Sequence, residues 1–310
     1  MGPEYQLVQF SYLENRDCFQ NEKPYQILSY LGDNKSKTNL AWEKPDKEKV
    51  INIRGRESEF RLDRHGFCFR TAPTTFTDWD VARQVETYHI PVVKQLIKEI
   101  VEGVDEVEIF DWRRRSTTWR APANQAVDMN NPTHALVPAQ QVHLDQSPYA
   151  TVKRVRKLMG SRADQLLKGR VRVINLWRPL DVVRNWPLAL GDGRTMGLSD
   201  LMAVDLVRKD YVGETMYQKY RPGFRWYYLH HQTPDEICLF KNFDSDRDVE
   251  STSMFSFQIV VGLANRLPKY ALIVPSPNLM PRVSLQTGRA WSLGLWYSHT
   301  PPAWKAKNRG

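Results

Sequence analysis

The sequence contains little cysteine and no long apolar stretch. Its three cysteines, Cys18, Cys68 and Cys238, are odd in number and far apart, which predicts reduced thiols and offers no spacing typical of a metal site. No run of eighteen apolar residues occurs, so a transmembrane helix is not predicted. The N-terminal residues lack the charged-then-apolar layout of a signal peptide. We therefore expect a soluble, cytoplasmic protein that makes no membrane contact.

The motifs of several common enzyme classes are also missing. The sequence has no G-x-S-x-G, no P-loop and no H-E-x-x-H, so serine hydrolase, nucleoside triphosphatase and zincin activities have no motif to support them. The segment "GDGRTMG" at residues 191–197 resembles a dinucleotide-binding fingerprint. Its third glycine comes one position late and no βαβ unit surrounds it, which favours a turn between strands.

Acidic residues are absent from the last sixty positions. Residues 251–310 hold seven of the 44 lysines and arginines but none of the 35 aspartates and glutamates. The net charge of +9 therefore belongs mostly to this divergent basic tail, and the nearly balanced remainder argues against nucleic-acid binding. The tail is either a basic arm or a coding sequence that diverged through a shifted reading frame or a retained intron. The lack of a dense basic run favours the second interpretation.

The first hundred residues contain strand-like and then helical patterns. Residues 48–70 alternate apolar and polar side chains in two runs broken at Gly55 and Gly66, which predicts an N-terminal β arm over residues 1–75. Helical spacing follows over residues 78–103. Its apolar stripe predicts a helix packed on a sheet, and the stripe consists of Val92, Val93, Leu96, Ile97, Ile100 and Val101.

Strand-like apolar stretches dominate the rest of the chain. They occur at residues 170–180, 186–192, 223–231 and 236–244, with a short helix expected over 199–210. The regular strand–helix alternation of a parallel α/β sheet is missing. We therefore predict a mainly β fold with flanking helices (α+β), whose core over residues 76–250 is a double-stranded β-helix, a cupin-like jelly roll.

A long polar loop is expected before the first of these stretches. A strand over residues 104–112 precedes it, and the loop begins with Arg113, Arg114 and Arg115. We expect these three arginines to form a solvated or substrate-facing turn.

The segment "QVHLDQSPYA" at residues 141–150 carries the most informative pair of side chains. In an extended strand, residues two apart point to the same face, so His143 and Asp145 project together and Leu144 points the other way. An imidazole and a carboxylate are two of the three ligands of the 2-His-1-carboxylate triad that holds non-haem Fe(II). The alternative is an ordinary polar strand end. Ser147 and Pro148 predict the start of a helix directly after the pair.

One polar side chain lies within an otherwise apolar strand face. Asn175 shares its face with Val171, Val173 and Trp177, and a buried amide requires a hydrogen-bond partner. Asn175 and the nearby Arg178 are therefore candidates for a substrate pocket. The alternative is a structural hydrogen bond for Asn175 and a surface position for Arg178.

Several blocks between residues 50 and 246 together carry a resemblance to a known family. The blocks are "RGRESEFRLDRHGF", "VEIFDWRRRS", "VHLDQSPYA", "RVINLWRPL", "PLALGDGRTM" and "DEICLFKNFDS", in that order. They resemble the fungal AsaB-type hydroxylase/desaturase family, which includes gibberellin-desaturase-like and CmcJ-like proteins. "NLWRPL" and "DEICLFKNFDS" carry most of the resemblance.

The resemblance implies a double-stranded β-helix that binds Fe(II) and 2-oxoglutarate and oxidises small molecules in secondary metabolism. It implies that His143 and Asp145 are the first two iron ligands. It also implies that an Arg-x-Ser pair, here Arg282 and Ser284, anchors the distal carboxylate of 2-oxoglutarate. The family has a histidine ligand after its "DS" segment, and this sequence has Met254 near that place.

Two functional hypotheses follow. The first is an Fe(II)/2-oxoglutarate-dependent hydroxylase or desaturase that acts on a small organic molecule in fungal secondary metabolism. The second is a non-oxidative member of the family, either a partner or scaffold of an active paralogue or a metal-free cyclase or isomerase, because the third histidine is replaced. Neither hypothesis involves nucleic acid, and both are compatible with a homo- or hetero-oligomer.

Overall fold

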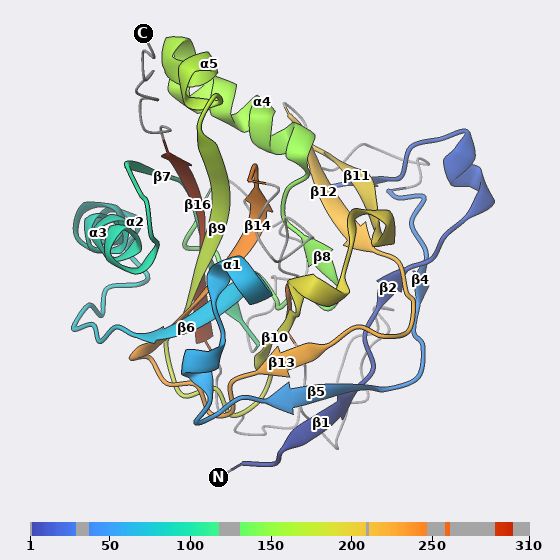
Figure 1. Cartoon of the computed structure of the whole chain (residues 1–310), viewed down its shortest axis with the longest axis horizontal. Helices are drawn as coiled ribbons and strands as arrows, with labels where there is room; N and C mark the ends of the chain where they lie inside the picture. The colour runs from blue at the N-terminus through green and yellow to red at the C-terminus, as the bar shows by residue number, and fades with distance from the viewer. Residues whose placement is uncertain are drawn as a thin grey trace, which may run out of the picture.

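The computed structural model is mainly β, with two large sheets and a few helices around them (Figure 1). The structure describes residues 2–28, 37–117, 131–208, 211–246, 258–260 and 289–299. Within these ranges, no helix is both long enough and apolar enough to span a bilayer.

The larger sheet has nine strands. Two of its neighbouring pairs, β5 with β13 and β11 with β3, are parallel, and the others are antiparallel. Across the sheet the order is β1 (Tyr5–Val8), β5 (Glu48–Asn52), β13 (Trp226–Tyr228), β10 (Leu188–Gly191), β15 (Gln258–Val260), β8 (His143–Leu144), β12 (Val212–Gln218), β11 (Leu201–Val207) and β3 (Tyr25–Ile27).

The second sheet has five strands, all antiparallel to their neighbours. Its order is β6 (Phe67–Thr71), β14 (Glu236–Asp244), β9 (Arg170–Pro179), β16 (Arg289–His299) and β7 (Glu106–Ser116). The pairing of β14 with β9 shifts register between Lys241 and Phe243. A separate small ribbon pairs β2 (Tyr12–Leu13) with β4 (Trp42–Glu43).

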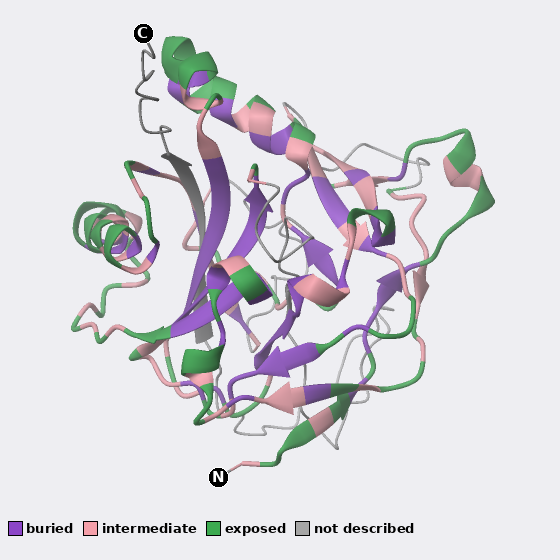
Figure 2. Cartoon of the chain, viewed as in Figure 1, coloured by how far each residue is buried: buried purple, intermediate pink, exposed green. Residues whose placement is uncertain are grey.

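Alternation along β9 creates two hydrophobic layers. Val171 and Val173 pack in a core cluster with side chains of β5, β8, β10, β12 and β13, so they face the larger sheet. Ile174 and Leu176, on the opposite face, pack with the helix at residues 90–100. Figure 2 shows these central strands as mostly buried, with exposed residues on the outer helices. The period of two in the sequence thus positions β9 between two cores.

Most helices lie outside the sheets (Figure 1). The α-helices are α1 (Leu62–His65), α2 (Ala82–Gln84), α3 (Ile90–Ile100), α4 (Pro148–Met159) and α5 (Ala163–Leu166). One short π-helix, η3 (Val85–His89), joins α2 to α3. The remaining short helices are η1 (Asp17–Gln20), η2 (Glu57–Glu59), η4 (Gly160–Arg162), η5 (Gly193–Thr195) and η6 (Leu198–Asp200).

The apolar stripe of α3 is narrower than the sequence predicts. Val93 and Ile97 are completely buried and Val101 nearly so, whereas the side chain of Val92 is exposed at 58% of its surface. A helix advances 100° per residue, so adjacent valines cannot both face the same sheet. The predicted packing of a helix on a sheet is confirmed for the face that carries Val93 and Ile97.

Helix α4 begins where the sequence predicts. The Ser147 Oγ accepts a hydrogen bond from the backbone N–H of Ala150 at 3.0 Å, and Pro148 occupies the first turn. Val155 and Met159 are buried on the inner side of the helix. This capped start positions the chain directly after the His143 and Asp145 pair.

Two local predictions were wrong. The helix expected over residues 199–210 is instead η6 followed by the strand β11, which hydrogen-bonds to β12 on one side and to β3 on the other. The loop expected to begin at Arg113 begins later, because residues 113–116 continue β7 and pair with β16. In both segments, hydrogen bonds to strands distant in sequence outweigh the local pattern.

A buried ionic cluster holds α1 against β9 and β14. The Lys241 Nζ lies 3.0 Å from Asp63 Oδ1 and 2.7 Å from Asp244 Oδ2. Arg170 donates two hydrogen bonds to Asp244, at 2.9 and 2.6 Å, and one to Asp63 at 3.0 Å. Because the side chains of Lys241 and Asp244 are completely buried, each depends on the others for its charge compensation.

The segments on either side of the predicted core contribute strands to both sheets. From residues 1–75, β1, β3 and β5 join the larger sheet and β6 joins the smaller one. From residues 251–310, β15 lies between β10 and β8, and β16 lies between β9 and β7. The domain boundaries near 75 and 250 stay predictions.

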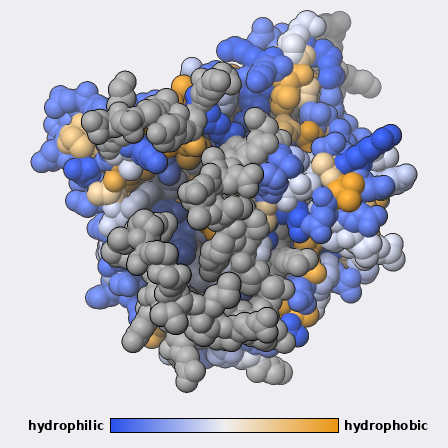
Figure 3. Space-filling view, turned by 180° about the vertical axis from the view of Figure 1, so that it is seen from behind, coloured by the Kyte–Doolittle hydropathy of each residue, from blue (hydrophilic) through white to orange (hydrophobic). Residues whose placement is uncertain are grey.

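Figure 3 shows the molecule from behind. Among the described residues on this face, hydrophilic side chains predominate and hydrophobic ones form small scattered groups. Such scattered exposure is normal for a protein surface and needs no partner.

Candidate metal centre

His143 and Asp145 lie at the end of β8, in the larger sheet. The His143 Nε2 is 3.5 Å from Asp145 Oδ1. Leu144, between them, is completely buried in the core cluster on the other face. The His143 side chain is 11% exposed and that of Asp145 is 38% exposed. The two polar side chains therefore form one partly open site at a strand end.

The imidazole of His143 is held in one orientation by the backbone. Its Nδ1 lies 2.7 Å from the carbonyl oxygen of Gln141. A carbonyl can only accept, so Nδ1 carries the hydrogen and donates it. In the neutral ring Nε2 is then a bare acceptor that faces the carboxylate of Asp145. A hydrogen bond of this kind on the distal nitrogen is typical of metal-binding histidines.

Asp145 is held by two asparagines from the smaller sheet, one at its carboxylate and one at its backbone. Its Oδ2 accepts a hydrogen bond from the Asn175 Nδ2 at 2.5 Å, and its backbone N–H donates to the Asn242 Oδ1 at 3.0 Å. Asn175 belongs to β9 and Asn242 to β14, and both are buried. The site is thus assembled where the two sheets face each other.

The surroundings keep Asp145 ionised. Burial alone would raise the pKa of its carboxyl, but the hydrogen bond and charge that His143 offers when its ring is protonated, the hydrogen bond from Asn175 and the charge of Arg115 together hold that pKa below its ordinary value. An ionised carboxylate is the form that a metal ion requires.

Two further side chains adjoin the pair. Arg115, from β7, donates to the carbonyl oxygen of Val137 at 2.9 Å. Its pKa is lowered, chiefly by burial, and the charge of Asp145 opposes that effect. Tyr217 is directly opposite His143 in the register of β12 with β8, and their ring centroids are 6.1 Å apart. Burial, followed by the charge of Asp145, raises the pKa of Tyr217 to about 12.

His143 and Asp145 provide two ligand atoms of the kinds that suit a ferrous ion. A bare imidazole nitrogen and a carboxylate oxygen 3.5 Å apart repel each other unless a proton or a metal ion lies between them. Bonds of roughly 2 Å to nitrogen and oxygen ligands allow one ion to contact both atoms. Within the ranges that the structure describes, no cluster of three His, Cys, Asp or Glu side chains is suitable for a metal. The described residues thus account for two ligands.

The other predicted site residues have different outcomes. Asn175 contacts Asp145 directly, as a hydrogen-bond donor. Arg178, also buried on β9, donates from Nη1 to the carbonyl oxygens of Ala72 and Pro234 at 2.7 and 2.6 Å. Arg178 therefore holds backbone segments together. Met254, Arg282 and Ser284 lie outside the described residues.

Three residues near the pair were not singled out from the sequence as site residues. Asn242 is fully buried within the "FKNFD" segment, where two polar side chains between Phe240 and Phe243 are the available signal. The polar neighbours of Arg115 predict a solvated or substrate-facing turn, and only the pairing of β7 extends the strand to this residue. Tyr217 had no local signal, since only the pairing of β12 with β8 brings it to His143.

The fold and the site together define the class of the protein. It is a mainly β protein of two facing sheets, with an imidazole and a carboxylate held between them. The family model described as "Oxidoreductase/YMDC permease-like domain" matches residues 10–259. This match covers most of the chain.

Similar curated proteins come from fungi. The hydroxylase/desaturase efuI of Hormonema carpetanum is 31% identical over 213 residues, which cover 64% of this chain and 72% of that protein. The Fe(II)/2-oxoglutarate-dependent dioxygenase nvfI of Aspergillus novofumigatus is 31% identical over 222 residues, which cover 68% and 74%. The chain therefore belongs to this family of oxidoreductases, and the predicted membership among the fungal hydroxylase/desaturase proteins is confirmed.

The fold has a counterpart among solved structures. The iron and alpha-ketoglutarate-dependent endoperoxidase NvfI superposes with a TM-score of 0.76 at 23% identity, and the match covers 96% of this chain and 99% of that one. The predicted mainly β architecture is confirmed by this likeness and by the two sheets themselves.

Proposed function

We propose that the protein is an Fe(II)- and 2-oxoglutarate-dependent oxygenase that hydroxylates or desaturates a small organic molecule in fungal secondary metabolism. The observation that carries the proposal is the convergence of the His143 Nε2 and the Asp145 Oδ1 at 3.5 Å. Each side chain is held from behind, one by a backbone carbonyl and the other by Asn175. Family membership supports the same reaction class.

In this proposal, His143 and Asp145 hold the iron, which when bound supplies the oxidising chemistry together with the 2-oxoglutarate co-substrate. Asn175 fixes the orientation of the Asp145 carboxylate, and the backbone carbonyl of Gln141 fixes the imidazole. The remaining task of the chain is to orient the substrate and to exclude water from the site.

A cationic side chain is available for an anionic co-substrate. Arg115 lies close enough to Asp145 for the two charges to shift each other's pKa. Its guanidinium suits a carboxylate, because the planar fork donates two parallel hydrogen bonds. Arg282 and Ser284 stay our proposal for the distal carboxylate of 2-oxoglutarate, on the basis of the family resemblance. Asn175 and Arg178 stay candidates for the substrate pocket.

The finer architecture is also proposed. The antiparallel pairing within two facing sheets supports a double-stranded β-helix, or jelly roll, as the core. The strands supplied by residues 1–75 support an N-terminal β arm packed on that core, and β15 and β16 support a tail that completes it.

The test uses the purified full-length protein under anaerobic conditions. Fe(II) and 2-oxoglutarate are added, and the visible charge-transfer band of the chelate and the release of succinate on exposure to oxygen are measured. We expect both signals in the native protein and neither in His143→Ala or Asp145→Asn. His134→Ala is the matched control, since His134 is exposed, and it should retain both signals.

The same experiment addresses the non-oxidative alternative. If native protein and Met254→His both lack the band and release no succinate, the oxygenase proposal fails and a partner, scaffold or metal-free role replaces it. If Met254→His gains activity that the native protein lacks, the chain is an impaired oxygenase whose third ligand has been lost.

A further inference from the structure

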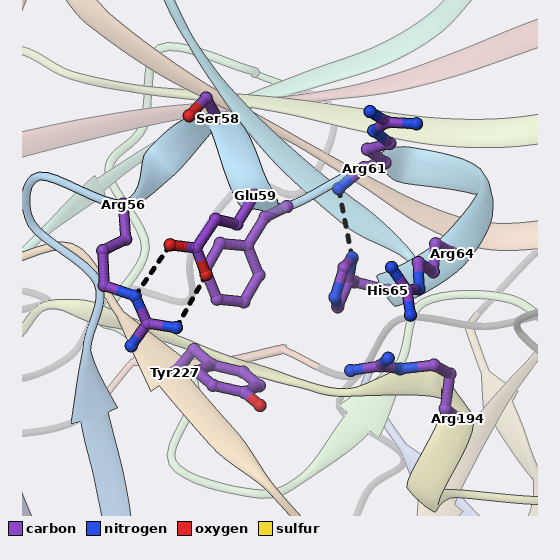
Figure 4. Close-up of a pocket in the computed structure, with 9 residues that line it drawn as sticks. Arg56, Ser58, Glu59, Arg61, Arg64, His65, Arg194 and Tyr227 are labelled. Atoms are coloured by element: carbon purple, nitrogen blue, oxygen red, sulfur yellow. Dashed lines mark hydrogen bonds and ion pairs between the residues drawn. The ribbon is translucent and has the colours of Figure 1, made fainter.

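A basic cavity lies at η2 and α1, and neither His143 nor Asp145 lines it. Its volume is about 450 Å³. The wall is formed by residues of η2 and α1, by η5 after β10, and by β13. The side chains that matter for its chemistry are Arg56, Arg61, Arg64, His65, Arg194 and Tyr227, all drawn in Figure 4.

The cavity has more positive than negative charge. Four of its lining residues are arginines, and one, Glu59, is acidic. Glu59 is occupied by Arg56, which donates to both carboxylate oxygens at 3.0 and 2.7 Å. Like charges gathered around one hollow raise the local potential and attract an anion. This local excess of positive charge is not a general property of the sequence, because the first 250 residues are nearly neutral.

Arg194 is fixed before any ligand arrives. Its Nε and Nη2 donate to Asp192 at 2.9 and 2.6 Å, and the side chain of Asp192 is completely buried. The Tyr227 hydroxyl donates to the same carboxylate at 3.5 Å. Burial would raise the pKa of Asp192, but the hydrogen bonds from Arg194 hold that pKa below its usual value. The guanidinium of Arg194 therefore loses little conformational entropy when a ligand binds.

His65 adds a directed donor. Its side chain is buried, and its Nδ1 accepts the backbone N–H of Arg61 at 3.1 Å. In the neutral ring the hydrogen must then be on Nε2, the atom left to bond an acceptor. Burial lowers the pKa of His65, and the positive charges of Arg194 and Arg64 lower it further. The negative charge of Asp192 partly offsets this lowering.

We propose that this cavity binds the phosphate group of a small organic phosphate. In Figure 4, Arg64, His65 and Arg194 lie together on one side of the cavity and Arg56 lies on the other. Arg56 is paired with Glu59, so the donors for a ligand are Arg64, His65 and Arg194, and their separate directions suit a tetrahedral phosphate, which presents acceptor oxygens in several directions. A carboxylate presents its acceptors in one plane. The volume leaves room for a small organic group beside the phosphate.

The test measures the binding of phenyl phosphate, inorganic phosphate and succinate to the full-length protein by titration calorimetry. We expect saturable binding of phenyl phosphate and weaker binding of succinate. Arg64→Gln should lower the affinity for phenyl phosphate about tenfold, the loss of one charge-assisted hydrogen bond. Arg156→Gln is the matched control, because Arg156 is an exposed arginine on α4, and it should bind as the native protein does.

A second readout comes from the ring resonances of His65. Bound phosphate should raise the pKa of His65, because a dianion offsets the charges of Arg64 and Arg194. Thermal unfolding of each variant verifies that Arg64→Gln folds normally. The proposal is overturned if phenyl phosphate does not saturate, if succinate binds equally well, if Arg156→Gln weakens binding as much as Arg64→Gln, or if the His65 titration is unmoved.

Discussion

The side-chain amide of Asn175 donates a 2.5 Å hydrogen bond to the Asp145 Oδ2, although Asn175 lies 30 positions away in β9 of the smaller sheet and Asp145 directly follows β8 of the larger sheet. The other oxygen of the same carboxylate faces the imidazole of His143. The amide therefore determines which lone pairs of Asp145 point toward the candidate metal position.

Removal of this amide should weaken metal binding without unfolding the protein. We expect Asn175→Ala to lower the affinity for Fe(II) by about 10- to 100-fold, the effect typical of residues that orient a metal ligand. Anaerobic titration with Fe(II), or with Co(II) as a spectroscopic substitute, measures the change. Asn21→Ala, at an exposed position, is the control. Equal affinities in the two variants would show that Asn175 has no role in orienting Asp145.

The buried ionic cluster should contribute strongly to stability. Asp244→Ala leaves the buried Lys241 and Arg170 with less compensation, and we expect the free energy of unfolding to fall by about 3 kcal/mol. Asp246→Ala removes a more exposed carboxylate that is 3.7 Å from the same arginine, so its effect should stay below about 1 kcal/mol. Urea denaturation at neutral pH measures both, and a similar loss in the two variants contradicts the role given to burial.

The N-cap of α4 is expected to follow the usual order of capping residues. Ser147→Ala removes the oxygen that accepts the Ala150 N–H and should cost about 1 kcal/mol of unfolding free energy. Ser147→Gly should cost only a few tenths of a kcal/mol, as glycine does at other N-cap positions. Thermal and urea unfolding compare the variants. A loss in Ser147→Gly as large as that in Ser147→Ala would assign the effect to packing of the buried serine instead.

His89 should make the protein less stable in mild acid. Its side chain is buried beside Phe76 and Trp79, and burial, followed by the charge of Arg178, lowers its pKa to about 4. An unfolded histidine titrates near pH 6.5, so between pH 6.5 and about 4 the unfolded chain binds a proton that the folded protein does not. The free energy of unfolding should therefore fall across this window, by on the order of 3 kcal/mol.

The replacement His89→Phe separates this effect from those of the carboxylates. The variant should lose less stability than the native protein between pH 6.5 and about 4, as urea unfolding at several pH values reports. Below that window, the lowered pKa of Asp244 should make both proteins still less stable in acid. Parallel pH profiles for the native protein and His89→Phe would rule out His89 as the cause.

Much of the candidate site could be predicted because its key relationship is local. His143 and Asp145 share a face because side chains alternate along any extended strand, whatever surrounds it. The start of α4 at Ser147 and Pro148 is equally local, since a cap depends on the first turn alone. The apolar faces of β9 followed from the same alternation, and Asn175 stood out as a polar side chain that needed a partner.

That Asp145 is the hydrogen-bond partner of Asn175 could not be predicted, because the pairing depends on which strands of the two sheets face each other. Residues 201–207 have apolar spacing that is compatible with a helix, yet they form β11 because β12 and β3 supply hydrogen bonds on both sides. Arg115 belongs to a polar run that resembles a loop, and only its pairing in β7 brings it near Asp145.

The sequence by itself determined which residues alternate, where α4 begins, and that one imidazole and one carboxylate project together, because each of these depends on neighbours within a few positions. The tertiary structure alone decided that Asn175 and Asn242 hold Asp145, that Tyr217 lies opposite His143, and that four arginines surround one cavity. These arrangements join segments from distant parts of the chain, and the free energy of such contacts depends on the packing of whole sheets.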